Sequence, residues 1–136
     1  AHAEKIAYVI QTARKVGVPV IGLNDSGGAR IQEGLSVTSA IGKIFFENSI
    51  ASGCIPQISA IMGPCIGVGS YSPALTDVIL QVQNSGQMFI TGPAVIKEVL
   101  GETVTMEELG GAKIHSEISG VTDLVAKNDE ECLVSW

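Results

Sequence analysis

The chain has 136 residues, about the length of one domain, and its formal net charge is −6 at pH 7. Charged residues make up 16% of it, against about 25% in an average soluble domain, while apolar residues make up 46%. This composition excludes a disordered chain, and the acidic balance with only 4% aromatic residues argues against nucleic acid as the primary ligand. The charge deficit indicates that a partner covers part of the surface.

Neither the apolar runs nor the cysteines point to a membrane or an oxidising compartment. No uninterrupted apolar run approaches the ~18 residues that span a bilayer, and no secretory signal pattern is visible. The cysteines are odd in number and lack CxxC spacing, which argues against a disulfide framework and a zinc site. We therefore expect no membrane insertion and a reducing compartment, the cytoplasm or, in a eukaryote, the mitochondrial matrix.

The first part of the chain alternates between helix and strand patterns. Apolar residues at three- and four-residue steps predict a helix over residues 1–15, which Gly17 ends. A buried strand is expected at 19–23, a loop at 24–28 and a long helix over 35–51. The expected core positions are Ile6, Val9, Ile10 and Ala13 in the first helix, and Ile41, Ile44 and Phe45 in the second.

The rest of the chain continues this alternation with shorter elements. They are a strand at 55–62, a loop at 63–70, a helix at 71–76, strands at 78–82 and 88–90, a helix at 94–100, a strand at 124–126 and a helix from Asn128 onward. Thr105, with Glu108 three residues later, forms a capping box for one more helix. The strands are continuously apolar, which is typical of an α/β protein whose strands are covered on both faces. Because the chain begins and ends inside helical patterns, we expect it to be a piece of a longer protein.

The glycine-rich segments only partly match the motifs of two cofactor-binding classes. Residues 67–69 read Gly-Val-Gly after a strand, but Ser72 stands at the third glycine of a dinucleotide-binding fingerprint. A phosphate-binding P-loop lacks its lysine, because none lies between Lys43 and Lys97. Both classes are disfavoured.

Residues 25–28, Asp-Ser-Gly-Gly, resemble the nucleophile loop of trypsin-like proteases. A catalytic triad is recognised by its geometry, however, and this serine follows a buried strand of an α/β pattern. We interpret Ser26 as a turn residue or helix cap, His115 in its polar loop as a surface residue, and Cys65 as a packing residue. The acid–base inventory is therefore thin, with no paired carboxylates, histidine dyad or metal cluster.

What remains is two glycine-rich loops, residues 24–28 and 63–70, each placed where a strand gives way to a helix. Glycines let backbone N–H groups approach a ligand closely, and the first N–H groups of a helix have no partner within it. Two such loops aimed at one point would form an oxyanion hole. Close packing alone explains the glycines equally well.

Residues 22–34, which read G-L-N-D-S-G-G-A-R-I-Q-E-G, resemble the signature of the biotin-dependent acyl-CoA carboxyltransferase subunits, a family that includes the β subunits of propionyl-CoA carboxylase. Further blocks match in order along nearly the whole chain. These blocks are 51–53, 55–59, 63–65, 71–74, 88–93, 107–112 and 119–121. One segment departs from the family pattern, since G-P-C-A-G-G-A-V-Y-S-P is replaced at residues 63–73 by G-P-C-I-G-V-G-S-Y-S-P.

The resemblance implies an α/β fold of the crotonase-like (ClpP/crotonase) type, built from repeated ββα units, in a subunit of two such domains. Residues 1–136 would form part of the N-terminal carboxyltransferase domain, and the C-terminal carboxyltransferase domain would lie outside this chain. The implied activity moves CO2 between carboxybiotin and the α-carbon of a short acyl-CoA through a thioester enolate. Biotin would be carried by a partner protein and would not be bound covalently to this chain.

The resemblance also implies roles for residues of both loops, and it implies no metal site. The residues implied to hold the enolate oxygen through their backbone N–H groups are Gly27, Gly28, Ala29, Gly67 and Val68. The implied substrate-binding residues are Arg30, Ile66 and Tyr71. Arg30 would pair with a CoA phosphate or anchor its own loop by an ion pair. Ile66 and Val68 are bulkier than the family residues and would either line the acyl pocket or fill the core.

The implied partners are an acyl-CoA substrate, a biotin carboxylase or biotin carrier subunit, and further copies of the chain in a homo-oligomer. One alternative with the same fold is the carboxyltransferase subunit of a biotin-dependent, sodium-pumping acyl-CoA decarboxylase. A second alternative is an assembly module that is inactive alone. These loops do not identify the acyl group.

Overall fold

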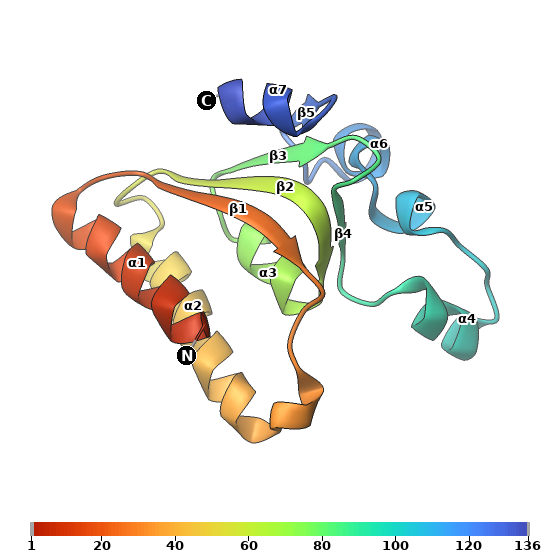
Figure 1. The fold of residues 1–136 in the computed structure, drawn as a ribbon, viewed down its shortest axis with the longest axis horizontal. Coiled ribbons are helices and arrows are strands. Elements are labelled where there is room, and N and C mark those ends of the chain that lie inside the picture. The colour runs from red at the N-terminus through yellow and green to blue at the C-terminus, as the bar shows by residue number, and fades with distance from the viewer. Residues whose placement is uncertain (1, 136) are drawn as a thin grey trace.

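The computed structural model describes residues 2–135, in which helices and strands alternate along the chain (Figure 1). The elements are α1 (His2–Val16), β1 (Val20–Ser26), the 3-10 turn η1 (Ile31–Glu33), α2 (Leu35–Ala51), β2 (Gln57–Ile66), α3 (Val68–Ala74), β3 (Val78–Val82), β4 (Gln87–Phe89), α4 (Pro93–Leu100), α5 (Met106–Gly110), α6 (Ala112–Ile114), the π-helix η2 (His115–Ser119), β5 (Leu124–Ala126) and α7 (Asp129–Val134). Ala1 and Trp136, at the outer ends of the expected first and last helices, lie outside the described residues. The predicted α/β alternation is confirmed.

The strands form one parallel sheet in the order β1-β2-β3-β5, and β4 pairs with β2 off this path. Strand β2 changes its neighbour along its length, because residues 58–61 run beside β3 and residues 64–66 run beside β4. Figure 1 shows β4 turned away from the rest of the sheet at this point. The carboxyl ends of parallel strands share one edge, so the segments that follow β1 and β2 emerge together.

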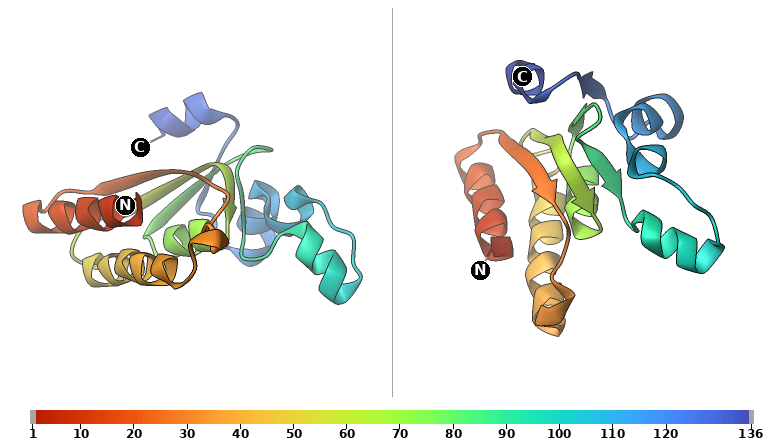
Figure 2. Two further views of the ribbon diagram at one scale, coloured as in Figure 1. Left: turned by 60° about the horizontal axis from the view of Figure 1, so that its bottom comes forward. Right: turned by 45° about the vertical axis from the view of Figure 1, so that its right-hand side comes forward.

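Helices α1, α2 and α3 lie on one side of the sheet, and α7 lies on the other (Figure 2). The core between α1, α2 and the sheet consists of Ala7, Ile10, Ala13, Ile44, Ala51 and Ile55. The core beneath α7 consists of Ala60, Leu80, Val82, Ala126 and Cys132. Among the expected core positions, Ile10, Ala13 and Ile44 are buried, whereas Val9 is exposed and the prediction for it was wrong.

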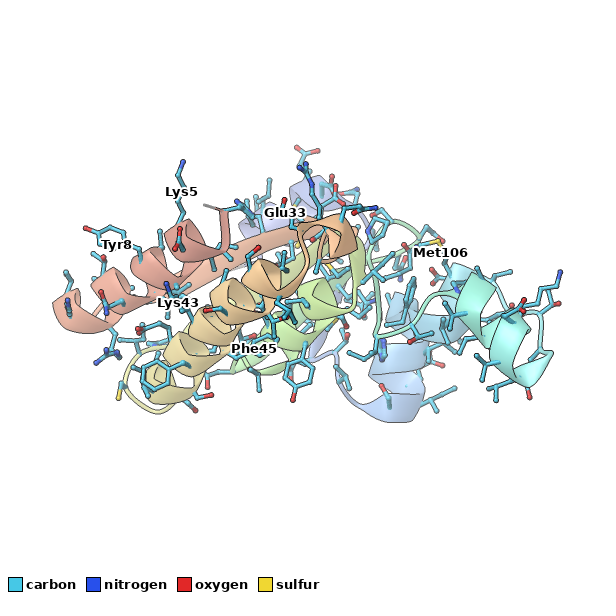
Figure 3. The ribbon with its side chains drawn as sticks, turned by 90° about the horizontal axis from the view of Figure 1, so that it is seen from below. Lys5, Tyr8, Glu33, Lys43, Phe45 and Met106 are labelled. Carbon is cyan, nitrogen blue, oxygen red and sulfur yellow. The ribbon has the colours of Figure 1, made fainter. Side chains whose placement is uncertain are left out.

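Ion pairs between polar side chains join α1 and α2, and Figure 3 labels one of these residues, Lys43. Lys43 Nζ lies 3.5 Å from Glu4 Oε1, and Arg14 Nη2 lies 3.6 Å from Glu47 Oε2. Tyr8 points outward from α1. The Lys43–Glu4 pair is exposed and adds little stability, whereas Glu47 is 8% exposed and its pair with Arg14 is largely buried. None of the described helices is both long enough and apolar enough to cross a bilayer.

One face of β1 is open, against the expectation that the strands are covered on both faces. Ile21 and Leu23 are 49% and 59% exposed. Strand residues alternate between faces, so these two point away from α1 and α2, and α7 packs over the cluster beside β3 and β5 instead. The prediction is wrong for β1, since no described helix covers this face of it.

Both glycine loops are shorter than predicted because the strands before them extend further. β1 continues to Ser26 and β2 continues to Ile66. The register between the two strands shifts after Asn24, which pairs with Ile61, because Ser26 pairs with Cys65. The extra residues on the β2 side form a bulge in β2. Pairing with β4 extends β2 to its end, and α3 begins at Val68, earlier than predicted.

His115 is not the surface residue in a polar loop that the sequence suggested. It begins the π-helix η2 and is half-buried. Its Nε2 lies 2.7 Å from the carbonyl oxygen of Met88, and its Nδ1 lies 2.8 Å from Ser119 Oγ. With both ring nitrogens hydrogen-bonded inside the fold, His115 ties η2 to β4.

Candidate functional site

The two glycine loops lie side by side at the carboxyl ends of β1 and β2. Gly28 has a φ of +92°, and a Cβ built on it would lie 2.7 Å from the carbonyl oxygen of Ile66. A Cβ built on Gly69 would lie 3.0 Å from the Cβ of Ser26. A side chain at Gly28 would be strained and would also collide with the second loop, so only glycine fits there. The loops that the sequence expected to act together are therefore in direct contact.

The backbone N–H groups of these loops divide into bonded and free ones. The Gly28 N–H donates to Ser26 Oγ at 3.2 Å, which agrees with the interpretation of this serine as a turn residue. The Gly67 N–H donates to the carbonyl oxygen of Phe89 at 3.0 Å. Of the five implied donors, the N–H groups of Gly27, Ala29 and Val68 make none of the turn and loop hydrogen bonds found among residues 2–135. Both loops therefore offer donors that are open to a ligand.

The implied substrate-binding residues surround this point in different ways. Arg30 is exposed, and its Nη1 lies 4.0 Å from Glu33 Oε1, so the loop-anchoring ion pair is long and leaves the guanidinium accessible. Ile66 is half-buried, in contrast to the fully buried Cys65 before it. The Tyr71 ring, half-exposed on α3, packs against Phe45 of α2 with 4.7 Å between ring centroids.

Cys65 is the packing residue that the sequence predicted. It is fully buried and clusters with Ile61, Ile79 and Met88. Burial raises the pKa of its thiol to about 11, and the Asp25 carboxylate adds to the rise. The thiol is therefore protonated at neutral pH and is not a nucleophile. Within the described part of the chain, no group of three His, Cys, Asp or Glu side chains could hold a metal ion.

We expect Cys65 to resist alkylation by iodoacetamide at pH 8 in the folded protein, because the thiolate is the reactive form. Mass spectrometry of folded and urea-unfolded protein measures the labelling, with the exposed Cys54 as an internal reference. Rapid labelling of Cys65 in the folded protein would contradict its buried state. Since folding raises this pKa from 9.0, the stability that the thiol contributes is complete below pH 9 and is lost as the pH rises toward 11.

Sequence reasoning missed two contacts that shape the site. The Phe89 carbonyl group reaches Gly67 only because β4 runs beside the end of β2, a long-range pairing without a local signal. The Asp25 side chain lies directly against the Cα of Gly63, where a Cβ would collide with it. A glycine inside an apolar strand pattern marks such close approaches, and this signal was present in the sequence.

Comparisons with known proteins place this chain in a family. A family model described as "Carboxyl transferase domain" matches residues 1–136. The alpha subunit of methylmalonyl-CoA decarboxylase from Veillonella parvula is 60% identical over 132 residues, 97% of this chain and 26% of the relative. The mitochondrial propionyl-CoA carboxylase beta chain from Homo sapiens is 56% identical over 133 residues, 98% of this chain and 25% of the relative. The chain thus spans about a quarter of the length of these relatives.

Solved structures show the same fold. The crystal structure of the transcarboxylase 12S hexamer with hydrolysed methylmalonyl-coenzyme A matches with a TM-score of 0.92 and 50% identity, over 96% of this chain and 26% of that one. The beta subunit of geranyl-CoA carboxylase from P. aeruginosa matches with a TM-score of 0.85 and 28% identity, over 96% of this chain and 25% of that one. The crotonase-like α/β class expected from the sequence is confirmed. With its whole length matched by the family model, this chain belongs to the carboxyl transferase domain family.

Proposed function

We propose that this chain forms the acyl-CoA side of a biotin-dependent carboxyltransferase site, as part of an N-terminal carboxyltransferase domain. The observation that carries the proposal is the contact between the two glycine loops, each of which leaves backbone N–H groups free. The donors that remain from the five implied residues are Gly27, Ala29 and Val68, while Gly28 and Gly67 shape the turns. Donors fixed before the reaction are well suited to a charge that develops on a thioester oxygen.

The chain's own residues act here by holding charge, and the thin acid–base inventory fits this role. An N–H group aimed at the enolate oxygen typically lowers the barrier by about 2.7–4 kcal/mol. Biotin on a partner carrier protein supplies the carboxyl group when it is present. The accessible guanidinium of Arg30 is suited to a CoA phosphate, and Tyr71 lies one helical turn beyond Val68 on the same side of α3.

A second candidate function is the reverse reaction, decarboxylation of an acyl-CoA coupled to a membrane pump. It is favoured by the 60% identity to a methylmalonyl-CoA decarboxylase subunit, close to the 56% identity to a propionyl-CoA carboxylase chain. Both directions pass through the same enolate, so the same loops serve either one. For either direction of the reaction we propose that the protein works in a reducing compartment, the cytoplasm or a mitochondrial matrix. We also propose that its partner is a biotin carboxylase or biotin carrier subunit.

The test is transfer by the full-length subunit from methylmalonyl-CoA to free biotin, followed as propionyl-CoA release that depends on biotin. We expect turnover that rises with biotin concentration and falls by about two orders of magnitude or more in Gly28→Val. Binding of CoA thioesters without any transfer would favour the assembly module instead. Sodium transport by the complex reconstituted with its membrane partners would favour the decarboxylase.

Ser26→Ala is expected to lower kcat of the full-length subunit by less than about tenfold, since it removes one long hydrogen bond worth about 0.5–1.5 kcal/mol. The Gly28 N–H loses its acceptor, but the glycine keeps its conformation. Steady-state kinetics measure the effect. Loss of all turnover with intact folding and CoA binding would indicate covalent catalysis by Ser26.

The full-length subunit is expected to form an oligomer. Only 16% of the residues are charged, and large apolar side chains such as Ile21, Leu23 and Val99 are exposed in this chain. The 12S transcarboxylase relative is described as a hexamer. Light scattering at micromolar concentration measures the mass, and a monomer would contradict the expectation.

A further inference from the structure

Helix α3 carries the free N–H of Val68, and its place in the fold is set by its neighbours. At seven residues it is too short to be stable as an isolated helix. Figure 1 shows it beneath the sheet, next to α2. One contact between these helices is the ring pair of Tyr71 and Phe45. Aromatic pairs accept several offset geometries, so this contact alone does not fix the position of α3.

Asn48 supplies a directional contact. Its side chain is 3% exposed, and its Oδ1 accepts a hydrogen bond from Ser72 Oγ of α3 at 2.9 Å. Its Nδ2 donates to Gln57 Oε1 at 3.0 Å, and Gln57 Nε2 donates back to the Asn48 carbonyl oxygen at 3.0 Å. Gln57 is fully buried and is the first residue of β2. A single amide side chain therefore joins α2, β2 and α3.

A second group of bonds holds the segment that follows α3. The Gln57 N–H donates to Asp77 Oδ2 at 2.8 Å, and the Asp77 N–H donates to the Gln57 carbonyl oxygen at 2.8 Å. Thr76 Oγ1 donates to the Pro73 carbonyl oxygen of α3 at 2.6 Å and lies 3.1 Å from Ser59 Oγ. Among the described residues of α3 itself, Ser72 alone makes a side-chain hydrogen bond. The Ser72–Asn48 bond is thus the directional side-chain link within the helix that carries Val68.

We propose that Asn48 is a positioning residue which, through Ser72, fixes α3 and so keeps the Val68 N–H beside the first glycine loop. The inference rests on the proposed function, because the position of this N–H matters only if it holds an enolate oxygen. Burying an amide adds little net stability even when it is fully hydrogen-bonded. What Asn48 provides that an apolar residue cannot is a fixed direction for α3.

Ser72→Ala cuts this link with the least disturbance, because Asn48→Ala would also leave the buried Gln57 Oε1 without its donor. Ser72→Thr keeps the hydroxyl group and serves as the rescue variant. The matched control is Thr122→Val, which removes a buried hydroxyl that donates to Gln81 Oε1 at 2.6 Å. Within the described residues, the side-chain hydrogen bonds of Gln81 do not reach α3, since its Nε2 donates to the carbonyl groups of Gly86 and Gly110.

The experiment measures kcat, KM, Tm and hydrogen exchange of the peptide covering α3, all in the assembled full-length subunit. In Ser72→Ala we expect kcat to fall about tenfold with KM changed less than twofold, because a displaced donor weakens the transition state more than substrate binding. The α3 peptide is expected to exchange faster. Ser72→Thr should restore both kcat and the exchange rate of the α3 peptide. Thr122→Val should lower the Tm by a similar amount to Ser72→Ala while keeping the wild-type kcat.

Equal effects of Ser72→Ala and Thr122→Val on kcat would overturn the proposal, since both would then act only through stability. Wild-type kcat in Ser72→Ala, beside an inactive Gly28→Val, would overturn it while leaving the proposed function intact. A wild-type subunit that transfers no carboxyl group would overturn the proposed function and the inference with it. Unchanged exchange of the α3 peptide in Ser72→Ala would overturn the anchoring role whatever the activity.

Discussion

Gly28→Val is expected to lower kcat of the full-length carboxyltransferase subunit by about two orders of magnitude or more, as for the loss of one oxyanion donor. Gly28 has a φ of +92°, which a β-branched residue rarely adopts, and its Cβ would lie 2.7 Å from the carbonyl oxygen of Ile66. The first loop must then move away from the second, and the N–H groups of Gly27 and Ala29 move with it. Steady-state kinetics on the assembled subunit measure the loss.

Gly42→Val is the matched control, because it makes the same change inside α2. A Cβ at Gly42 has nothing within 4 Å, and its φ is not positive. We expect this variant to keep kcat and to melt close to the wild-type temperature. If Gly28→Val melts and assembles like Gly42→Val and also keeps its kcat, the first loop does not hold the reacting oxygen.

The order and type of the elements could be predicted because each has a local cause. The capping box of Thr105 and Glu108 is present, with the Glu108 N–H donating to Thr105 Oγ1 at 3.1 Å and the Thr105 N–H donating to Glu108 Oε2 at 2.9 Å. Pro93 opens α4, where its missing N–H is not needed. The ends of β1 and β2 were misplaced because long-range pairing decides them. Glycine and proline at residues 63–64 indicated a loop, yet pairing with β4 keeps them in the strand.

The contact between the two glycine loops could be predicted from the sequence, but not which of their N–H groups are hydrogen-bonded within the fold. The Gly67 N–H donates to the carbonyl oxygen of Phe89 and is therefore not available to a ligand. No local sequence pattern reveals this bond. The link from Asn48 to Ser72 was also missed, although one signal was available. Asn48 and Gln57 are polar residues within or beside apolar runs, and a buried polar residue must find a hydrogen-bond partner.

The open face of β1 has a different physical reason. The continuous run of apolar residues at 19–23 is typical of a strand covered on both sides, and the pattern is a property of the whole protein. Ile21 and Leu23 are exposed in a chain that spans about a quarter of the length of its relatives. Covering apolar surface of this kind is a general driving force for association, so the pattern carries information about contacts that this chain cannot make with itself.

The double variant Ile66→Ala/Val68→Gly is expected to shift kcat/KM toward longer acyl-CoAs relative to acetyl-CoA. Both side chains are half-buried and flank Gly67, and Ile66 Cβ would lie 3.9 Å from a Cβ at Gly28, so Ile66 faces the first loop. Each methylene group accommodated or excluded in an apolar pocket changes the discrimination by roughly 1–3 kcal/mol, or about 10- to 200-fold. The Val68 N–H is a backbone group and remains in the variant.

A chain-length series of acyl-CoAs, measured with the wild type and the double variant, gives the shift directly. Ile50→Ala is the control, because it shortens a half-buried isoleucine near the end of α2, away from the loops. Lost packing alone would lower the Tm of both variants and leave the order of substrate preference unchanged. A pocket lined by Ile66 and Val68 would change the order only in the double variant. An unchanged preference in a folded double variant would therefore mean that the two side chains fill the core, and that other residues define the acyl pocket.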